Sequence, residues 1–397
     1  MKRTIVPILI AAAVGYSLPA QAAQFKVNCN TGQSLSKAVN RAKTDDSILV
    51  TGECDESIVI QKNGVSIIGK GASIRVDNID NNNSAVTISG AQRVSITGLD
   101  IFGGHFGIFG NNGASFKLQD VSVAETQVNG IQLSSASHAD FHDVTVAQTG
   151  GNGVNLADGS GISVTGTFSI QNAGSFGLNA QSVSSVLTND ANITITGSRA
   201  MGVHMVTGSN LFINNTQLLA NFNVLRGISI NSGSGFFAFN SDISANNTLA
   251  LDGLAFANAV IDIDRSSIVS ANGNGRDGIV VEASTFTSFI FPPVNGPTIS
   301  ANNNRRHGIR AVLGSKIELK EGTTLTVTGN GAAGILIDDG SAANLRNSTV
   351  VNNDTNAEGW ADIELSFASR LDTVSGNTIG TLSCDATVAS RGQMVCP

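Results

Sequence analysis

A glycine followed by an aliphatic residue recurs at nearly constant spacing, and each copy opens a short run of alternating apolar and polar residues. Successive glycines lie 23 to 30 residues apart, at Gly107, Gly130, Gly153, Gly177, Gly202, Gly227, Gly253, Gly278, Gly308 and Gly334. Each unit carries a second alternating run, such as DVTVAQ or TLTVTGN. The repeats show no apolar stripe of period 3.6, which a helical repeat would need. This pattern predicts an all-β solenoid, a single-stranded right-handed parallel β-helix.

Asparagine recurs six positions before the glycine in the later repeats, at Asn221, Asn247, Asn272 and Asn302. Stacked coils would place these amides above one another, where they can form a hydrogen-bonded ladder. The earlier repeats have Ala124 and Ala147 at this position. We therefore expect the ladder only in the C-terminal half.

The ends of the chain predict caps. A solenoid exposes strand edges at both ends, and such edges invite pairing with other chains. The segment TGQSLSKAVNRAKTDD offers Ser34 as a helix N-cap and an apolar helical face made of Leu35, Ala38, Val39 and Ala42. We expect an N-terminal cap with this helix over 23–63, about 12 coils over 64–380 and a C-terminal cap over 381–397.

The first residues, MKRTIVPILIAAAVGYSLPAQAAQF, have the pattern of a secretory signal over 1–22, which predicts a secreted or periplasmic protein. No later apolar stretch reaches the roughly 20 residues of a membrane-spanning helix. Loss of Lys2 and Arg3 leaves 21 basic residues against 30 acidic ones, a formal charge of -9. This charge disfavours general attraction to nucleic acid. The oligomeric state is left open.

The four cysteines form two local pairs, Cys29 with Cys54 and Cys384 with Cys396, one near each end. In an exported protein this spacing favours two disulfides that staple the caps over a catalytic thiol or a metal site. Four free buried thiols are the alternative.

Three features together resemble the pectate-lyase-like superfamily of right-handed parallel β-helix proteins. They are the glycine–aliphatic repeat, the Asn-rich turns and the opening CNTGQSLSKAVNRAKTDDSILVTGECDESIVI. The resemblance covers essentially the whole chain after the signal. The superfamily includes polysaccharide lyases, polygalacturonases, uronan epimerases, phage tailspikes and non-enzymatic surface proteins. The resemblance therefore implies the fold but does not select a reaction.

The stretch NNNRRHGIRA, residues 302–311, concentrates positive charge in an acidic chain. Arg310 follows an inward aliphatic residue and should stand on the outer face of its strand, with Arg305, Arg306 and His307 in the preceding turn. Adjacent coils lie roughly 4.8 Å apart. This spacing should bring further charged residues of the neighbouring coils into the same groove, namely Arg276, Asp277, Glu282 and Asp338.

This groove suggests lyase chemistry, which needs a base and a cation that neutralises a carboxylate. If the protein is catalytic, we expect β-elimination, with Arg310 or His307 as the base and the other arginines around a uronate carboxylate. In the alternative, Arg310 pairs with Glu282 or Asp338 across coils and the other arginines are solvated. Such surface pairs are typically worth less than about 1 kcal/mol.

Other candidate clusters are weaker. HADFHD, residues 138–143, lacks a third ligand strand for a metal and is typical of a solvated edge. The runs DID at 262–264 and GNGRDG at 273–278 only hint at Ca²⁺, so no cofactor is predicted. His204 points outward four repeats before the basic stretch, about 19 Å away, and only a long ligand could join the two.

The sequence thus predicts a secreted β-helix protein that binds or modifies an extracellular, acidic polysaccharide. The alternative is a non-catalytic surface or envelope protein with a structural or adhesive role. The basic stretch favours the first function. The single Trp and single Tyr favour the alternative, since sugar-binding faces generally use aromatic platforms.

Overall fold

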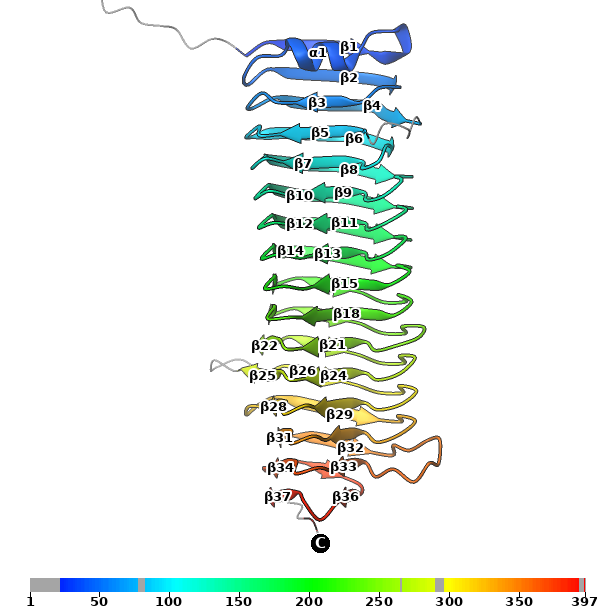
Figure 1. The fold of residues 1–397 in the computed structure, drawn as a ribbon, viewed down its shortest axis with the longest axis vertical. Coiled ribbons are helices and arrows are strands. Elements are labelled where there is room, and N and C mark those ends of the chain that lie inside the picture. The colour runs from blue at the N-terminus through cyan, green and yellow to red at the C-terminus, as the bar shows by residue number, and fades with distance from the viewer. Residues whose placement is uncertain (1–21, 78–82, 265, 290–295, 393–395, 397) are drawn as a thin grey trace, which may run out of the picture.

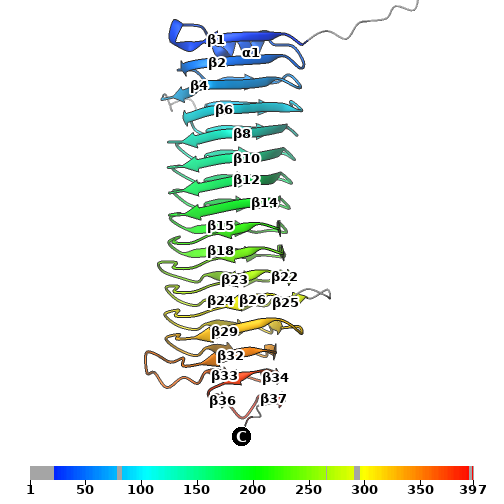
Figure 2. The ribbon, with the colours of Figure 1, turned by 180° about the vertical axis from the view of Figure 1, so that it is seen from behind.

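The computed structural model describes residues 22–77, 83–264, 266–289, 296–392 and 396. Residues 1–21 of the predicted signal lie outside this part. The strands stack as successive coils between α1 and the C-terminal end (Figures 1 and 2). They form two sheets, one of 23 strands and one of 14, and the pairings within both are parallel. The prediction of a parallel β-helix is confirmed.

The 14-stranded sheet receives one short strand from each coil. Its strands are β3 (Ile58–Ile60), β5 (Val86–Ser89), β7 (Ile108–Asn111), β9 (Ile131–Leu133), β11 (Val154–Leu156), β13 (Leu178–Ala180), β15 (Met201–Met205), β18 (Arg226–Asn231), β21 (Leu254–Ala257), β24 (Ile279–Glu282), β27 (Ile309–Val312), β30 (Ile335–Ile337), β33 (Ile363–Leu365) and β36 (Leu382–Cys384).

The 23-stranded sheet supplies the rest of each coil, with long bent strands in the first half and two shorter strands per coil in the second. Its strands are β1 (Gln24–Asn28), β2 (Ser47–Cys54), β4 (Ser66–Val76), β6 (Val94–Gly103), β8 (Ser115–Ala124), β10 (His138–Ala147), β12 (Gly161–Gln171), β14 (Ser185–Thr196), β16 (Asn210–Asn214), β17 (Gln217–Leu219), β19 (Gly235–Phe239), β20 (Asp242–Ser244), β22 (Val260–Asp264), β23 (Ile268–Ser270), β25 (Thr285–Phe289), β26 (Thr298–Ser300), β28 (Lys316–Glu318), β29 (Thr324–Thr328), β31 (Ala342–Leu345), β32 (Ser348–Val351), β34 (Arg370–Thr373), β35 (Thr378–Ile379) and β37 (Ala389–Gly392).

The N-terminal end is closed by the short helices η1 (Cys29–Thr31) and α1 (Leu35–Arg41). Ser34 caps α1 as predicted, because its hydroxyl accepts a hydrogen bond from the backbone N–H of Lys37 at 3.1 Å. The helix buries Leu35 and Val39. Within the described ranges, no helix is long and apolar enough to cross a membrane.

Both predicted disulfides are present. Cys29 is bonded to Cys54, which ties η1 to the end of β2. Cys384 is bonded to Cys396, which closes the C-terminal segment onto β36. The described cysteines include no free thiol.

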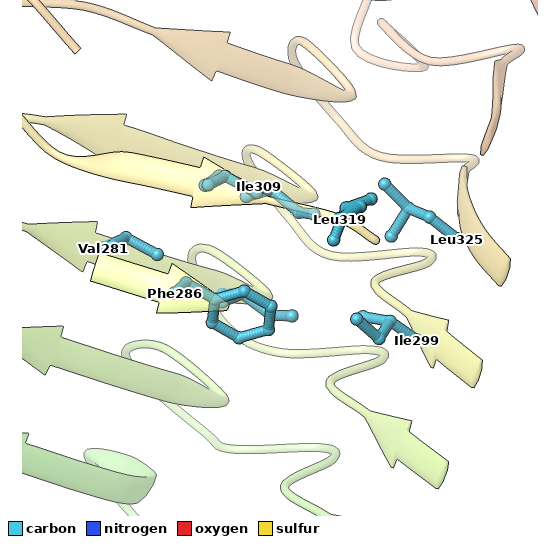
Figure 3. A pocket seen from close by; sticks show the side chains of 8 residues that line it. Val281, Phe286, Ile299, Ile309, Leu319 and Leu325 are labelled. Atoms are coloured by element: carbon cyan, nitrogen blue, oxygen red, sulfur yellow. The ribbon is translucent and has the colours of Figure 1, made fainter. Parts of the chain in front are cut away.

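Inward-pointing aliphatic and phenylalanine side chains fill the interior of the coils, as burial of apolar surface requires. Figure 3 shows a gap among them, beside Phe286, Ile299 and Leu325. Its volume is about 10 Å³ and its lining is entirely apolar. A space of this size holds at most one water molecule. A ligand site must therefore lie on the outside of the solenoid.

An asparagine ladder runs along one turn of the later coils, as expected, but one of its members differs from the prediction. The side-chain oxygens of Asn221, Asn246 and Asn272 accept backbone N–H groups of the next coil at 2.7, 2.6 and 2.7 Å. Asn246 takes the place predicted for Asn247, since the repeat from Gly227 to Gly253 is one residue longer than the preceding one.

Candidate functional site

The second residue after each repeat glycine lies on the outer surface of the 14-stranded sheet. The strand register stacks these positions along the solenoid, and we call them the outer row. From the N-terminal side the outer row consists of Phe109, Gln132, Asn155, Asn179, His204, Ser229, Ala255, Val280, Arg310 and Leu336. The turn that precedes each strand runs beside the outer row, so the two together form the candidate groove.

Arginines and acids alternate where the turns meet the second half of the outer row. Asp252 has no exposed surface and accepts a hydrogen bond from Nε of Arg226 at 3.1 Å. Nε and Nη2 of Arg276 bind its two oxygens at 2.7 and 2.6 Å. The hydrogen bond to Asp252 raises the pKa of Arg276. This carboxylate therefore holds the guanidinium groups of two neighbouring coils.

Asp277 holds the next step of the same chain. Its carboxylate is fully buried and accepts the backbone N–H of His307 at 3.1 Å and Nε of Arg310 at 3.2 Å. Burial raises the pKa of Asp277, although the His307 amide and the charge of Arg310 oppose the rise. Nη2 of Arg310 also lies 2.6 Å from Oε1 of Glu282. We call Arg226, Asp252, Arg276, Asp277, Arg310 and Glu282 the charged chain.

The charged chain contains as many acids as arginines, so it carries no net charge. Arg310 is held by two carboxylates and its side chain is 18% exposed. The structure thus shows the cross-coil pairing with Glu282 that the sequence offered as an alternative. Because a base must give up a proton before it can accept one, this ion pairing argues against Arg310 as the base.

His307 lies beneath the groove rather than in it. Its side chain has no exposed surface, and among the described residues neither ring nitrogen has a hydrogen-bond partner. The ring meets the edge of Trp360 with centroids 5.2 Å apart. Burial and the positive charge of Arg306 lower the pKa of His307 to about 4. A ring in this position cannot take a proton from a glycan outside, so its burial argues against the predicted base role.

Arg305 and Arg306 remain exposed, and within the described ranges no carboxylate pairs with either of them. They lie at an open hollow of about 430 Å³, which we call the arginine hollow. Its lining residues are Gly275, Arg276, Arg305, Arg306, Ala332, Asn356, Glu358 and Trp360. Three arginines face one acid there, so the hollow can bind an anion.

The segment 352–362 between β32 and β33 builds one wall of the arginine hollow. It is the wide orange turn that leaves the stack in Figure 1. Nδ2 of Asn356 donates to the carbonyl of Arg305 at 3.3 Å, and Nε1 of Trp360 donates to Oε2 of Glu358 at 3.2 Å. The sequence did not place Trp360 here, because its position depends on the path of this long turn.

The predicted site residues therefore fall into separate groups. Arg276, Arg305 and Arg306 line the hollow, while Arg310, Asp277 and Glu282 belong to the charged chain. Asp338 lies outside both groups, and its Oδ1 accepts a hydrogen bond from Ser366 at 2.8 Å.

The HADFHD segment lies on the other sheet, in β10. Nε2 of His138 is 3.3 Å from Oδ1 of Asp140, and Nδ1 of His142 is 3.1 Å from the hydroxyl of Thr165. In the part of the chain that the structure describes, no group of three or more His, Cys, Asp or Glu is placed to hold a metal ion.

Comparison with known proteins identifies the fold. Residues 48–168 match the family described as the right-handed β-helix region, and no curated protein matches the sequence. The A-module of the mannuronan C-5 epimerase AlgE6 from Azotobacter vinelandii has 14% identity and a TM-score of 0.53, over 89% of this chain and 99% of that one. A mutant of the periplasmic alginate epimerase AlgG has 14% identity and a TM-score of 0.41, over 94% and 83%.

A third solved structure, the pectin methylesterase PemA from Erwinia chrysanthemi, has 11% identity and a TM-score of 0.30, over 55% of this chain and 82% of that one. At these identities the likeness concerns the fold and not the reaction. The chain has the right-handed parallel β-helix fold of the pectate-lyase-like superfamily.

Proposed function

We propose that the protein binds or modifies an acidic extracellular polysaccharide along the groove, with the arginine hollow as the anchor for a carboxylate. The observation that carries this proposal is the position of Arg305 and Arg306 beside Trp360 in an open hollow. Arginine can bind a carboxylate through two parallel hydrogen bonds. An indole ring offers an apolar face and one N–H donor. An acidic sugar matches both features.

The shape of the groove supports a polymer rather than a single sugar. The outer row from Phe109 to Leu336 covers ten coils, about 43 Å at the usual strand spacing. The AlgE6 A-module, whose name states that it acts on mannuronan, shares this fold and supports a polysaccharide as the ligand. The signal at residues 1–22 and the two disulfides support a secreted or periplasmic location.

If the protein is catalytic, lyase-type β-elimination is the reaction we propose. A non-catalytic surface or envelope protein is the second candidate. The neutral charged chain favours it, because Arg276 and Arg310 spend their hydrogen bonds on Asp252, Asp277 and Glu282.

The experiment measures binding by calorimetry with polymannuronate, polygalacturonate and a neutral glucan, at low and high salt. The native protein should bind the polyuronates only, and more weakly at high salt. The double variant Arg305→Ala/Arg306→Ala should lose at least tenfold in affinity, and Trp360→Ala should also bind less tightly.

Arg370→Ala is the matched control, since Arg370 is an exposed arginine of a surface pair with Asp372. It should bind as the native protein does. Equal affinity for the neutral glucan, or no binding of any polyuronate, would refute the proposal. Ultraviolet absorbance of the products reports whether an unsaturated uronate forms, which separates a lyase from a binding protein.

A further inference from the structure

Four side chains of the outer row form one continuous line of hydrogen bonds across β9, β11, β13 and β15. Nδ2 of Asn155 donates to Oε1 of Gln132 at 2.8 Å, and Nδ2 of Asn179 donates to Oδ1 of Asn155 at 2.6 Å. Nδ1 of His204 lies 2.8 Å from Oδ1 of Asn179. Gln132, Asn155 and Asn179 are buried, so the line forms a fixed support for the histidine at its end.

The direction of these bonds determines which nitrogen of His204 carries the proton. The amide nitrogen of Asn179 already donates to Asn155, and its oxygen, which can only accept, is the atom beside Nδ1. Nδ1 must therefore hold a hydrogen. In a neutral imidazole the other nitrogen then has a free lone pair. Nε2 of His204 has no hydrogen-bond partner among the residues that the structure describes.

The surroundings keep this ring neutral and fixed in orientation. Burial, and then the positive charge of Arg226, lower the pKa of His204. The ring of Phe176, from the turn before β13, stacks on the imidazole with centroids 4.6 Å apart and planes 20° apart. Arg226 on the next coil is thus the charged group that acts on the ring, while Asn179 and Phe176 present only an amide and an aromatic ring to it.

Arg226 also provides what a base alone lacks. Its Nε is bound to Asp252, and its side chain is 23% exposed at the start of β18, the strand that pairs with β15. Its terminal amino groups have no hydrogen bond to any described residue. A uronate carboxylate beside Arg226 would place the neighbouring carbon, C5, near the imidazole.

We propose that His204 is the base of this groove and that Gln132, Asn155 and Asn179 are positioning residues for it. This inference rests on the proposed function, a polyuronate in the groove. Nε2 forms a bond to the C5 proton while the C5–H bond breaks, and the electron pair moves into the carboxylate, whose charge Arg226 neutralises. The carbanion then expels the oxygen at C4, which takes a proton from water, or regains a proton at C5.

The distance along the groove fits a polymer. His204 lies four coils before Arg310, about 19 Å at the usual strand spacing. A polyuronate anchored at the arginine hollow would extend past His204. This is the long ligand that the separation of the two sites requires.

The first experiment uses the step that both outcomes share, exchange of the C5 proton. Polymannuronate and polygalacturonate are incubated with the protein in D₂O, and deuterium at C5 is measured by NMR, together with products that carry a new double bond. The native protein should incorporate deuterium or form product. His204→Gln should lower the rate at least 100-fold, since a general base contributes about 10²- to 10⁴-fold.

His105→Gln is the matched control, because His105 lies in a turn of the same groove and its ring nitrogen contacts only Gln127. It should keep the native rate. A native rate in His204→Gln would overturn the inference. If the native protein binds polyuronate without exchange or product, the inference fails and the proposed function stands, whereas absence of binding defeats the proposed function itself.

The second experiment tests the positioning role through the pH profile. In Asn179→Asp the Nδ1–H of His204 would donate to a carboxylate, which favours the imidazolium and raises the pKa of His204. Because only the neutral ring can act as a base, the acidic limb of the rate profile should move to higher pH. An unmoved limb would overturn the positioning role. Long-range ¹H–¹⁵N NMR of the native protein should show a protonated Nδ1 and a bare Nε2, and the opposite tautomer would also overturn it.

Discussion

Arg276 grips Asp252 with two hydrogen bonds, from Nε and Nη2 at 2.7 and 2.6 Å, and the carboxylate it grips has no exposed surface. Arg226 of the preceding coil binds the same carboxylate. A buried carboxylate is tolerated only when its oxygens are paired. Asp252 therefore fixes the arginines of two coils at the floor of the groove.

Removal of Asp252 should destabilise the solenoid. Asp252→Ala leaves two partly buried guanidinium groups without their partner, so we expect a loss of about 3 kcal/mol in the free energy of unfolding. Urea denaturation followed by circular dichroism measures it. Asp372→Ala removes the acid of an exposed pair with Arg370 and should cost less than about 1 kcal/mol. Equal losses in the two variants would contradict this account.

A second asparagine ladder should also be stabilising. Oδ1 of Asn304 accepts the backbone N–H of Asn274 at 2.9 Å and its Nδ2 at 3.0 Å. Both asparagines are buried. Asn304→Ala would leave two buried donors unpaired, at a cost of about 2 to 4 kcal/mol. Thermal denaturation should show the loss, whereas Asn40→Ala, at an exposed position of α1, should leave the transition within a degree or two. An unchanged transition in Asn304→Ala would count against the ladder.

The repeat period explains why so much of the fold could be predicted. It assigned each glycine–aliphatic strand to one coil, and stacking then named the neighbours across coils, so the sequence alone could offer Glu282 as a partner of Arg310. The line of amides was also within reach of the sequence, because Gln132, Asn155, Asn179 and His204 occupy one offset from the glycine in four successive repeats. The direction of their hydrogen bonds was not, since it depends on how each amide is turned.

Features that depend on the turns escaped the sequence. The period does not specify the path of segment 352–362, and that path brings Trp360 over His307 and buries it. The ladder position of Asn246 was missed for a similar reason, since one extra residue in a turn shifts the register of a side chain without changing the strands. Periodicity thus predicts the walls of the groove better than its rim.

Acid should weaken the native fold through His307. Its pKa is about 4 in the folded protein against an ordinary value of 6.5, so between these values the unfolded chain binds the proton more readily. The contribution of a neutral His307 is complete above pH 6.5 and declines as the pH falls towards 4, by up to about 3 kcal/mol.

The variant that tests this is His307→Leu, which cannot titrate and removes two unpaired buried nitrogens. Thermal midpoints at about pH 7 and about pH 4.5 should differ less in His307→Leu than in the native protein. At neutral pH its midpoint should not fall below the native one by more than the small cost of repacking. An equal drop on acidification in both proteins would exclude His307 as the source.

The recurring glycine should be required for space rather than for backbone conformation. A Cβ at Gly153 would meet the carbonyl oxygen of Gly177 on the next coil at 2.7 Å and would collide with the side chain of Ile170. A backbone oxygen in a stacked coil cannot move aside without separating the strands. Gly153→Ala should therefore cost about 3 kcal/mol, the upper end of the usual cost of overpacking.

Gly159 is the matched control, since it lies in the turn after β11 with φ of +71° and no atom within 4 Å of an added Cβ. Gly159→Ala meets only the backbone cost of a left-handed conformation, about 1 kcal/mol. Urea midpoints of the two variants should keep this order. If Gly159→Ala were the more damaging, the glycine–aliphatic repeat would reflect backbone conformation, and the close approach of neighbouring coils at Gly153 would not explain why glycine recurs there.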